Sequence, residues 1–184
     1  GSKPQEYFSG IIKSHYHAQY MSKFISDERV FFYIYRDPVD TLLSYWRFLH
    51  KWEEVHKNVG KLGKTPAEFL NVSPTQKSQR YQYCLFENYF LRWANHVSDW
   101  IELGKKIDNV IVVRYENLKN NYTPEVNRLL AAIGYNSKKF CEKPPREAYW
   151  HGKNIPVSKE DIQEFKSIIK KRMNNFSLIP NEYR

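Results

Sequence analysis

The clearest pattern of hydrophobic and polar positions lies between residues 30 and 52. Residues 30–35 read Val-Phe-Phe-Tyr-Ile-Tyr, an unbroken apolar and aromatic run typical of a strand buried on both faces. Apolar residues then recur at spacings of three and four from Val39 to Leu49, which predicts a helix with one face on a core. Between them, Asp37 suits an N-cap and Pro38 suits the first helical position. The pattern therefore predicts a strand, a tight turn and a helix.

Similar signals divide the rest of the chain. Val110-Ile-Val-Val113 predicts a second buried strand within residues 109–114. Spacing and capping signals predict further helices over 18–25, 67–71, 76–103, 123–133 and from Ser158 to about 173, with Gly104 and Gly134 as helix stops. Residues 53–64 are hydrophilic and predict a mobile surface loop, and 141–156, with three prolines, predict another. Strands separated by helices indicate one α/β domain over residues 1–184, with a largely parallel sheet flanked by helices.

Composition narrows the classes of partner. The net charge of +9 favours an anionic partner: a nucleotide, a polyanion, nucleic acid or a membrane surface. Nucleic-acid binding ranks last, because the basic residues are dispersed rather than clustered with aromatic ones. Oligomeric state leaves no signal in the sequence.

Cysteine usage and hydropathy bear on the compartment. Cys84 and Cys141 make no disulfide framework and no zinc spacing, which favours a reduced compartment, and we expect the cytoplasm. The chain has no apolar run long enough to cross a bilayer and no signal peptide. Gly1-Ser2 resembles a vector remnant, so a leader or anchor could have been removed.

Arg36 and Ser44 are candidate phosphate ligands. Arg36 follows the first predicted strand, and Ser44 lies about two turns into the helix after it. Free N–H groups at a helix start, a guanidinium and a hydroxyl suit a phosphate, at the edge where open α/β sheets bind ligands. Alternatively, Arg36 pairs with Asp37 or Asp40, and Ser44 is simply a small helical residue.

Lys13, His15 and Tyr115 are further candidates. Histidine is well suited to take a proton from a hydroxyl near neutral pH, and a lysine two residues away could stabilise charge on a bridging oxygen. The alternative is an ordinary solvated basic patch. Tyr115, at the end of the second strand, could pack under a purine or fill the core.

Other motifs carry no chemistry in this interpretation. Gly63-Lys64-Thr65 resembles the tail of a phosphate-binding loop, but Asn58 stands where the pattern needs glycine, and the residues before it look helical rather than extended. We therefore reject it as a phosphate loop. The stripe of Trp93, Val97 and Trp100 is interpreted as core, and four histidines show no ligand spacing: His50, His56, His96 and His151.

Five segments together resemble a known family. Residues 35–46 resemble the 3′-phosphate-binding segment of sulfotransferases that use 3′-phosphoadenosine 5′-phosphosulfate (PAPS), and Lys13-Ser14-His15 resembles their Lys-Thr-His segment. Three further segments fall in the family's order: 65–70, 95–100 and 114–119. The resemblance covers residues 11–134 well and the remainder weakly.

The resemblance implies a P-loop NTPase-like sulfotransferase fold and transfer of a sulfuryl group from PAPS to a hydroxyl or amine of an acceptor. It implies that His15 is the general base and that Lys13 binds the transferring group. Arg36 and Ser44 would hold the 3′-phosphate, with Tyr115 near the nucleotide. PAP, the 3′,5′-bisphosphate, would be the product, and no metal is required.

Two family elements are missing. The Lys-Ser/Thr-Gly-Thr loop for the 5′-phosphosulfate occurs nowhere in the chain, and only twelve residues precede Lys13. We expect that the N-terminal part of the domain, with its first strand, is absent from this chain. The C-terminal Arg-Lys-Gly segment is also not recognisable, although Lys153 could substitute for it. The alternative function is a non-catalytic domain that binds a 3′-phosphonucleotide or a polyanion.

Overall fold

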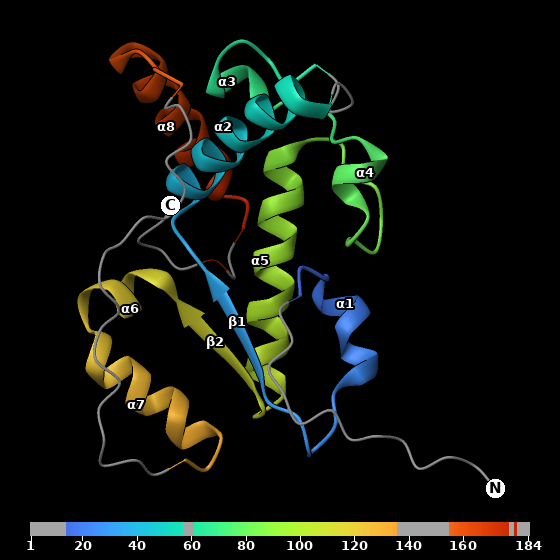
Figure 1. Ribbon diagram of the computed structural model, residues 1–184, viewed down its shortest axis with the longest axis vertical. Coiled ribbons are helices and arrows are strands. Elements are labelled where there is room, and N and C mark those ends of the chain that lie inside the picture. The colour runs from blue at the N-terminus through green and yellow to red at the C-terminus, as the bar shows by residue number, and fades with distance from the viewer. Residues whose placement is uncertain (1–13, 57–60, 136–154, 177–178, 180–184) are drawn as a thin grey trace, which may run out of the picture.

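Two parallel strands lie at the centre of the fold in the computed structural model (Figure 1). The structure describes residues 14–56, 61–135, 155–176 and 179. Strand β1 (Phe31–Tyr35) pairs with β2 (Val110–Arg114), with Phe31 opposite Val110 and Tyr35 opposite Arg114. The pairing confirms the predicted α/β class with a parallel sheet.

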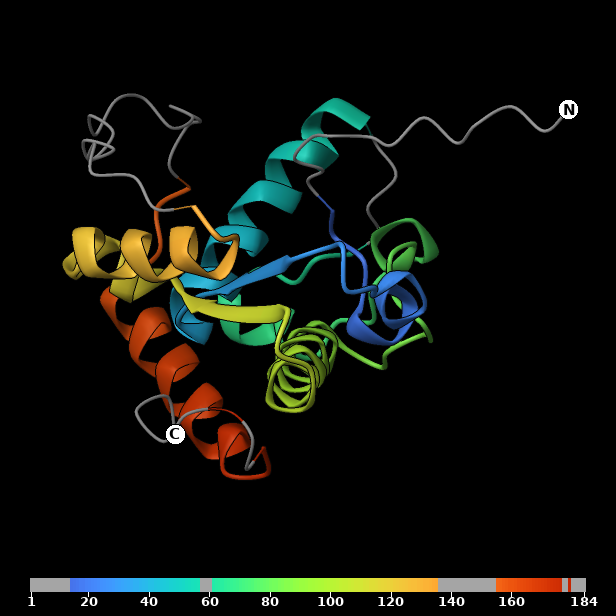
Figure 2. The same cartoon turned by 90° about the horizontal axis from the view of Figure 1, so that it is seen from below.

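Helices surround this pair and make up most of the rest of the described chain. They are α1 (Ala18–Met21), the 3₁₀-helix η1 (Ser22–Phe24), α2 (Pro38–His56), α3 (Pro66–Phe69), α4 (Gln76–Gln79), α5 (Tyr89–Lys106), α6 (Tyr115–Asn120), α7 (Tyr122–Ala132) and α8 (Lys159–Met173). Helix α5 packs against β2, and α1 packs against α5. Figure 2, which shows the molecule from below, places α5 under the two strands with α1 beside it.

The predicted unit of strand, turn and helix is confirmed by its cap. Asp37 Oδ1 accepts a hydrogen bond of 2.9 Å from the Asp40 amide, and Pro38 is the first residue of α2. The inward face of α2 is buried: Leu42, Trp46 and Leu49 expose 1%, 3% and 4% of their surface. They join residues of α3, α5 and α8 in the main core.

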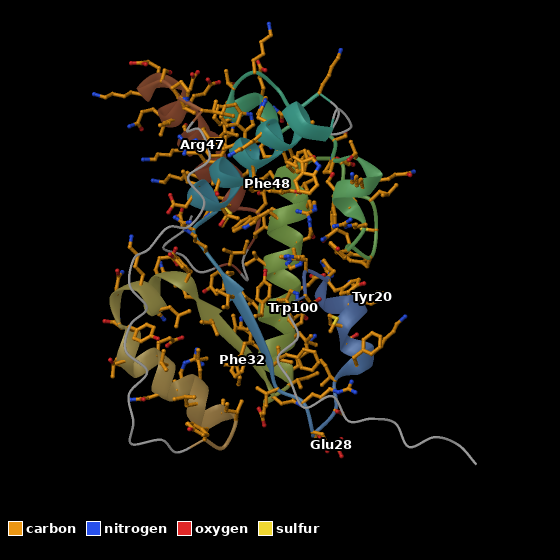
Figure 3. All side chains as sticks on the ribbon, in the orientation of Figure 1. Tyr20, Glu28, Phe32, Arg47, Phe48 and Trp100 are labelled. Carbon is orange, nitrogen blue, oxygen red and sulfur yellow. The ribbon has the colours of Figure 1, made fainter. Side chains whose placement is uncertain are left out.

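The prediction that β1 is buried on both faces is wrong. Phe32 and Ile34 are 42% and 54% exposed (Figure 3), whereas Tyr35 is buried. Alternate strand residues point to opposite faces, and Tyr33 on the other face stacks on Trp100 of α5 with the ring centroids 5.0 Å apart. The described helices therefore cover only one face of this strand.

The single helix predicted over 76–103 is two helices. The side chain of Gln79 is buried between α4 and α5, where it donates to the carbonyls of Pro74 and Phe86 and accepts from the Phe86 amide. Asn88 then caps α5, because its side chain accepts a hydrogen bond of 2.9 Å from the Leu91 amide. These bonds hold a turn where helical spacing alone predicted continuity.

Gly104 does not stop α5, which continues to Lys106. A Cβ atom on Gly104 would lie 2.5 Å from Val112 Cγ2 and 3.1 Å from the Val110 carbonyl oxygen. Glycine at this position therefore allows the helix to approach β2 closely.

The other boundaries need smaller corrections. Helix α2 continues through His56, so the predicted loop over 53–64 begins later than expected, and Leu62 within it is buried. Residues 18–25 form α1 and η1 rather than one helix. Gly134 follows α7 with the expected positive φ of 69°, and Ser158 caps α8 through the Asp161 amide. The predicted loop over 141–156 lies almost entirely outside the described residues.

Candidate functional site

The carboxyl ends of β1 and β2 bring two of the predicted site residues together. Arg36 directly follows β1, and Tyr115 directly follows β2. Since the strands are parallel and Tyr35 pairs with Arg114, both residues leave the sheet at the same edge. The guanidinium carbon of Arg36 lies 5.0 Å from the centroid of the Tyr115 ring. A cation and an exposed aromatic ring thus share one surface, an arrangement that suits a nucleotide.

A glutamate that the sequence analysis missed connects the two strand ends. Glu116 Oε1 accepts from the Asp37 amide at 3.0 Å, and Oε2 accepts from Arg114 Nε at 3.3 Å. One carboxylate therefore fixes the start of α6 against the turn before α2. Its position within the family-like segment 114–119 was the available signal.

Arg36 has one side-chain donor without a partner in the described part of the chain. Its Nη2 lies 2.5 Å from Asp40 Oδ2, so the alternative contact with Asp40 is confirmed. Both side chains are about half exposed, and an exposed ion pair of this kind contributes only about 0–1 kcal/mol. Arg36 Nε is buried and has no hydrogen-bond partner among the described residues. An incoming phosphate can compete with Asp40 for the half-exposed guanidinium.

Ser44 lies on the exposed surface of α2, one helical turn beyond Asp40. Residues four apart lie on the same face of a helix. Asp40 and Ser44 consequently share one face of the first two turns of α2, and Arg36 precedes this helix.

His15 is exposed and precedes α1, with its ring centroid 6.0 Å from that of Tyr81. Its backbone lies near the ring of His96, whose Nδ1 is 2.9 Å from the Tyr33 hydroxyl in β1. Arg36 is three residues beyond Tyr33, about 10 Å at the rise of a strand. Lys13 and Lys153 lie outside the described residues.

The buried His17 and the partly buried His96 lie close to the segment that carries His15, and the sequence analysis found no signal for either. The side chain of His17 is fully buried, and His96 Nδ1 lies 2.9 Å from the Tyr33 hydroxyl. Burial, with a smaller contribution from the nearby Arg92 charge, lowers the pKa of His17 to about 4. Burial followed by the charges of His17 and Arg92 lowers the pKa of His96 to about 3. Both imidazoles are therefore neutral at physiological pH.

The rejected phosphate-loop motif has a structural role. Thr65 caps α3 by accepting from the Glu68 amide at 3.2 Å, and the Glu68 carboxylate accepts from the Lys64 amide at 2.6 Å. The preceding chain is helical through His56. The Lys64 amide, which belongs to the motif, thus already bonds to a protein carboxylate.

No helix within the described ranges is both long and apolar enough to cross a membrane. In that same part of the chain, no three His, Cys, Asp or Glu side chains group as metal ligands would.

Comparison with known proteins identifies the family. The model of the sulfotransferase domain family matches residues 3–151, well over half of the 184 residues. Cytosolic sulfotransferase 16 of Arabidopsis thaliana is 30% identical over 104 residues, a match that covers 56% of this chain. The same match covers 27% of that protein, so the chain corresponds to about a quarter of its relative's length. No solved structure matches significantly. With its α/β architecture and the ordered motifs around β1 and β2, this chain belongs to the sulfotransferase domain family.

Proposed function

We propose that this chain belongs to a PAPS-dependent sulfotransferase that acts on a hydroxyl or amine of an acceptor. The observation that carries the proposal is the junction of Arg36 with Tyr115 at the carboxyl ends of the two strands. Family membership favours this transferase over the nucleotide-binding or polyanion-binding alternative.

The residues at this junction fit a nucleotide that carries a 3′-phosphate. Among the described residues, none accepts a hydrogen bond from the buried Nε of Arg36. A phosphate oxygen would accept a charge-assisted hydrogen bond from it. Ser44 adds a hydroxyl on the face of α2 that carries Asp40, and the exposed ring of Tyr115 can cover a purine. Lys153 remains a predicted further contact to this phosphate.

His15 would act as the general base. The bound donor supplies a sulfuryl group whose bond to phosphate is broken as the acceptor attacks sulfur. His15 would take the proton from the acceptor oxygen or nitrogen as that atom bonds to sulfur, and Lys13 would stabilise the charge on the bridging oxygen. The His15 imidazole is exposed to solvent and is therefore accessible to an acceptor.

The proposal also extends to location. The relative is called cytosolic, and Cys84 is a free thiol. Both are in keeping with the cytoplasm, where thiols stay reduced.

Calorimetric titration with PAP, using AMP as the comparison nucleotide, tests the site. We expect the chain to prefer PAP, and Arg36→Ala to weaken PAP binding by about 10- to 100-fold, the range expected for hydrogen bonds to a charged group. Ser44→Ala should weaken it less, by about three- to tenfold. Arg29→Ala, at the amino end of β1 and exposed, is the matched control and should leave PAP binding unchanged.

The outcome against the proposal is equal affinity for PAP and AMP, or equal losses in Arg36→Ala and Arg29→Ala. If the wild-type chain binds neither nucleotide, the titration should be repeated on the full-length natural protein. Absence of binding there would refute the family site altogether. His15→Gln then separates an enzyme from a binding domain, since only an enzyme loses turnover while PAP affinity stays constant.

A further inference from the structure

The short segment that carries His15 is held at successive residues by one face of α5. Residues 14–17 form no helix or strand of their own. His96, Asp99 and Trp100 of α5 are spaced by three and four, so they lie on one helical face. Each of the three contacts a different residue of the 15–17 segment.

The contacts run in order along the segment. The backbone of His15 lies within interaction range of the His96 ring. Trp100 Nε1 donates to the carbonyl oxygen of Tyr16 at 3.2 Å. Asp99 Oδ2 lies 3.3 Å from Nε2 of the fully buried His17, although the pair lacks hydrogen-bond alignment.

β1 supports this face of α5 from the other side. The Tyr33 hydroxyl is 2.9 Å from His96 Nδ1, and the Tyr33 ring stacks on Trp100 at 5.0 Å with an interplanar angle of 8°. Because Tyr33 engages Nδ1, Nε2 of the His96 ring is left available to the His15 backbone. Figure 3 shows Trp100 on α5 where this helix lies between β1 and α1. Strand and helix together fix the two groups that hold the segment.

We propose that His96 and Trp100 are positioning residues for His15, since they hold the backbone at residues 15 and 16 and thereby direct the His15 imidazole toward the acceptor. The proposal rests on the proposed function, because it takes His15 as the general base. A general base must lie within hydrogen-bond reach of the proton that it removes, and small misplacements reduce rates steeply. An exposed side chain on a segment without regular structure needs such anchors.

The test uses a pair of identical substitutions on the same helix. Trp100→Phe removes the indole N–H that bonds to Tyr16 but keeps an aromatic ring against Tyr33. Trp93→Phe is the matched control, because Trp93 and Trp100 are similarly buried, at 8% and 6% exposed. The amide of His17, which donates to the Tyr81 carbonyl at 2.9 Å, reports whether the segment stays in place.

The first readout is hydrogen exchange measured by NMR on the chain without nucleotide. We expect Trp100→Phe to speed exchange of the His17 amide by about five- to tenfold relative to Trp93→Phe, with exchange in β2 unchanged between the two variants. Equal exchange of the His17 amide in both variants would overturn the proposal. An increase spread evenly over β2 as well would do the same, because it would show a general loss of stability.

His96 supplies a second, independent pair of variants. His96→Leu removes the polar contacts with both Tyr33 and the His15 backbone, whereas His96→Gln retains a donor and an acceptor. We expect faster exchange of the His17 amide in His96→Leu and near wild-type exchange in His96→Gln. Wild-type exchange in His96→Leu contradicts the role assigned to His96.

The second readout is sulfuryl transfer to 4-nitrophenol, compared with PAP affinity. Trp100→Phe should lower kcat about tenfold without changing the dissociation constant for PAP, whereas Trp93→Phe should change neither. A lower PAP affinity with unchanged kcat would contradict positioning. If PAP binds neither to this chain nor to the full-length natural protein, the proposed function fails, while the exchange result still decides whether α5 holds the segment.

Discussion

At the scale of single residues, Arg36 forms an ion pair with Asp40 at the phosphate site that we propose. Asp40, in the first turn of α2, contacts the Arg36 guanidinium from the same helix that carries Ser44. The Asp40 carboxylate contacts Nη2 of the guanidinium. The buried Nε has no hydrogen-bond partner among the described residues. Asp40 therefore competes with the phosphate that we propose for this site.

Asp40→Asn should tighten PAP binding by about two- to fivefold, because removal of an exposed ion pair worth up to about 1 kcal/mol frees the guanidinium. The same change should lower the free energy of unfolding by roughly 0.5 kcal/mol, because Asp40 is an acidic residue in the first turn of α2. Calorimetry and urea unfolding measure the two effects.

Asp108→Asn removes the same charge at an exposed position before β2 and serves as the control. If the Asp40 variant binds PAP more weakly than the control, Asp40 supports the phosphate site instead of competing with it.

At the scale of helices and strands, local sequence signals predicted where most helices begin. They did not predict the features that depend on contacts with other elements. Asp37 and Ser158 cap their helices as expected, since a cap joins groups within three residues of each other. The break between α4 and α5 was missed, because it depends on Gln79, which bonds to groups five and seven residues away. Gly104 was misassigned for a related reason: its neighbour is Val112 in β2, not the end of its own helix.

Gly104→Ala should destabilise the fold by about 1–3 kcal/mol, although alanine favours a helix over glycine by about 1 kcal/mol. The reason is that the new Cβ would lie 2.5 Å from Val112 Cγ2. Thermal and urea unfolding of the variant measure the loss.

Val112→Ala provides the second arm of a double-mutant cycle. Gly104→Ala should cost less in the Val112→Ala background, because the clashing methyl group is gone. An equal cost in both backgrounds would mean that the contact with Val112 is not what requires glycine, and a stabilising Gly104→Ala would refute the packing argument.

At the scale of the whole molecule, His17 and His96 connect stability to pH. His17 has a pKa lowered to about 4 in the folded chain, against an ordinary value near 6.5. The unfolded chain therefore binds more protons between these two values, so stability is fully present above about pH 6.5 and is lost as the pH falls toward 4. His96, whose pKa is lowered to about 3, acts in the same direction and over a wider range.

The free energy of unfolding should therefore fall as the pH drops from about 6.5 to 4. His17 contributes on the order of 3 kcal/mol, at 1.36 kcal/mol for each pH unit. Asp99 opposes this trend at the acidic end, because burial and the nearby Glu102 charge raise its pKa. Urea unfolding at a series of pH values measures the dependence.

His17→Asn should flatten that dependence, because asparagine does not titrate. The substitution keeps an acceptor for the Gln19 amide at the start of α1. His15→Asn, which changes an exposed histidine, should leave the dependence nearly as it is in the wild type. A wild-type slope in His17→Asn would show that burial of His17 is not the source of the acid sensitivity.

The sequence by itself determined the strand, the turn and the capped helix around Arg36, and the ordered motifs that led to the family. These features depend on spacing and on contacts between residues a few positions apart, which a linear sequence displays directly. Ser44, Arg36 and Asp40 belong to this class, because one helix carries or adjoins all three.

Only the tertiary structure decided which distant residues meet. The Glu116 bond to the Asp37 amide joins residues 79 positions apart, and Trp100 bonds to Tyr16 across 84 positions. These contacts require β1 and β2 to pair in one register and α5 to pack alongside them. The free energy that these hydrogen bonds contribute depends on their burial and on how the surrounding helices and strands pack. The junction of Arg36 with Tyr115 and the anchoring of His15 by α5 therefore became visible only in three dimensions.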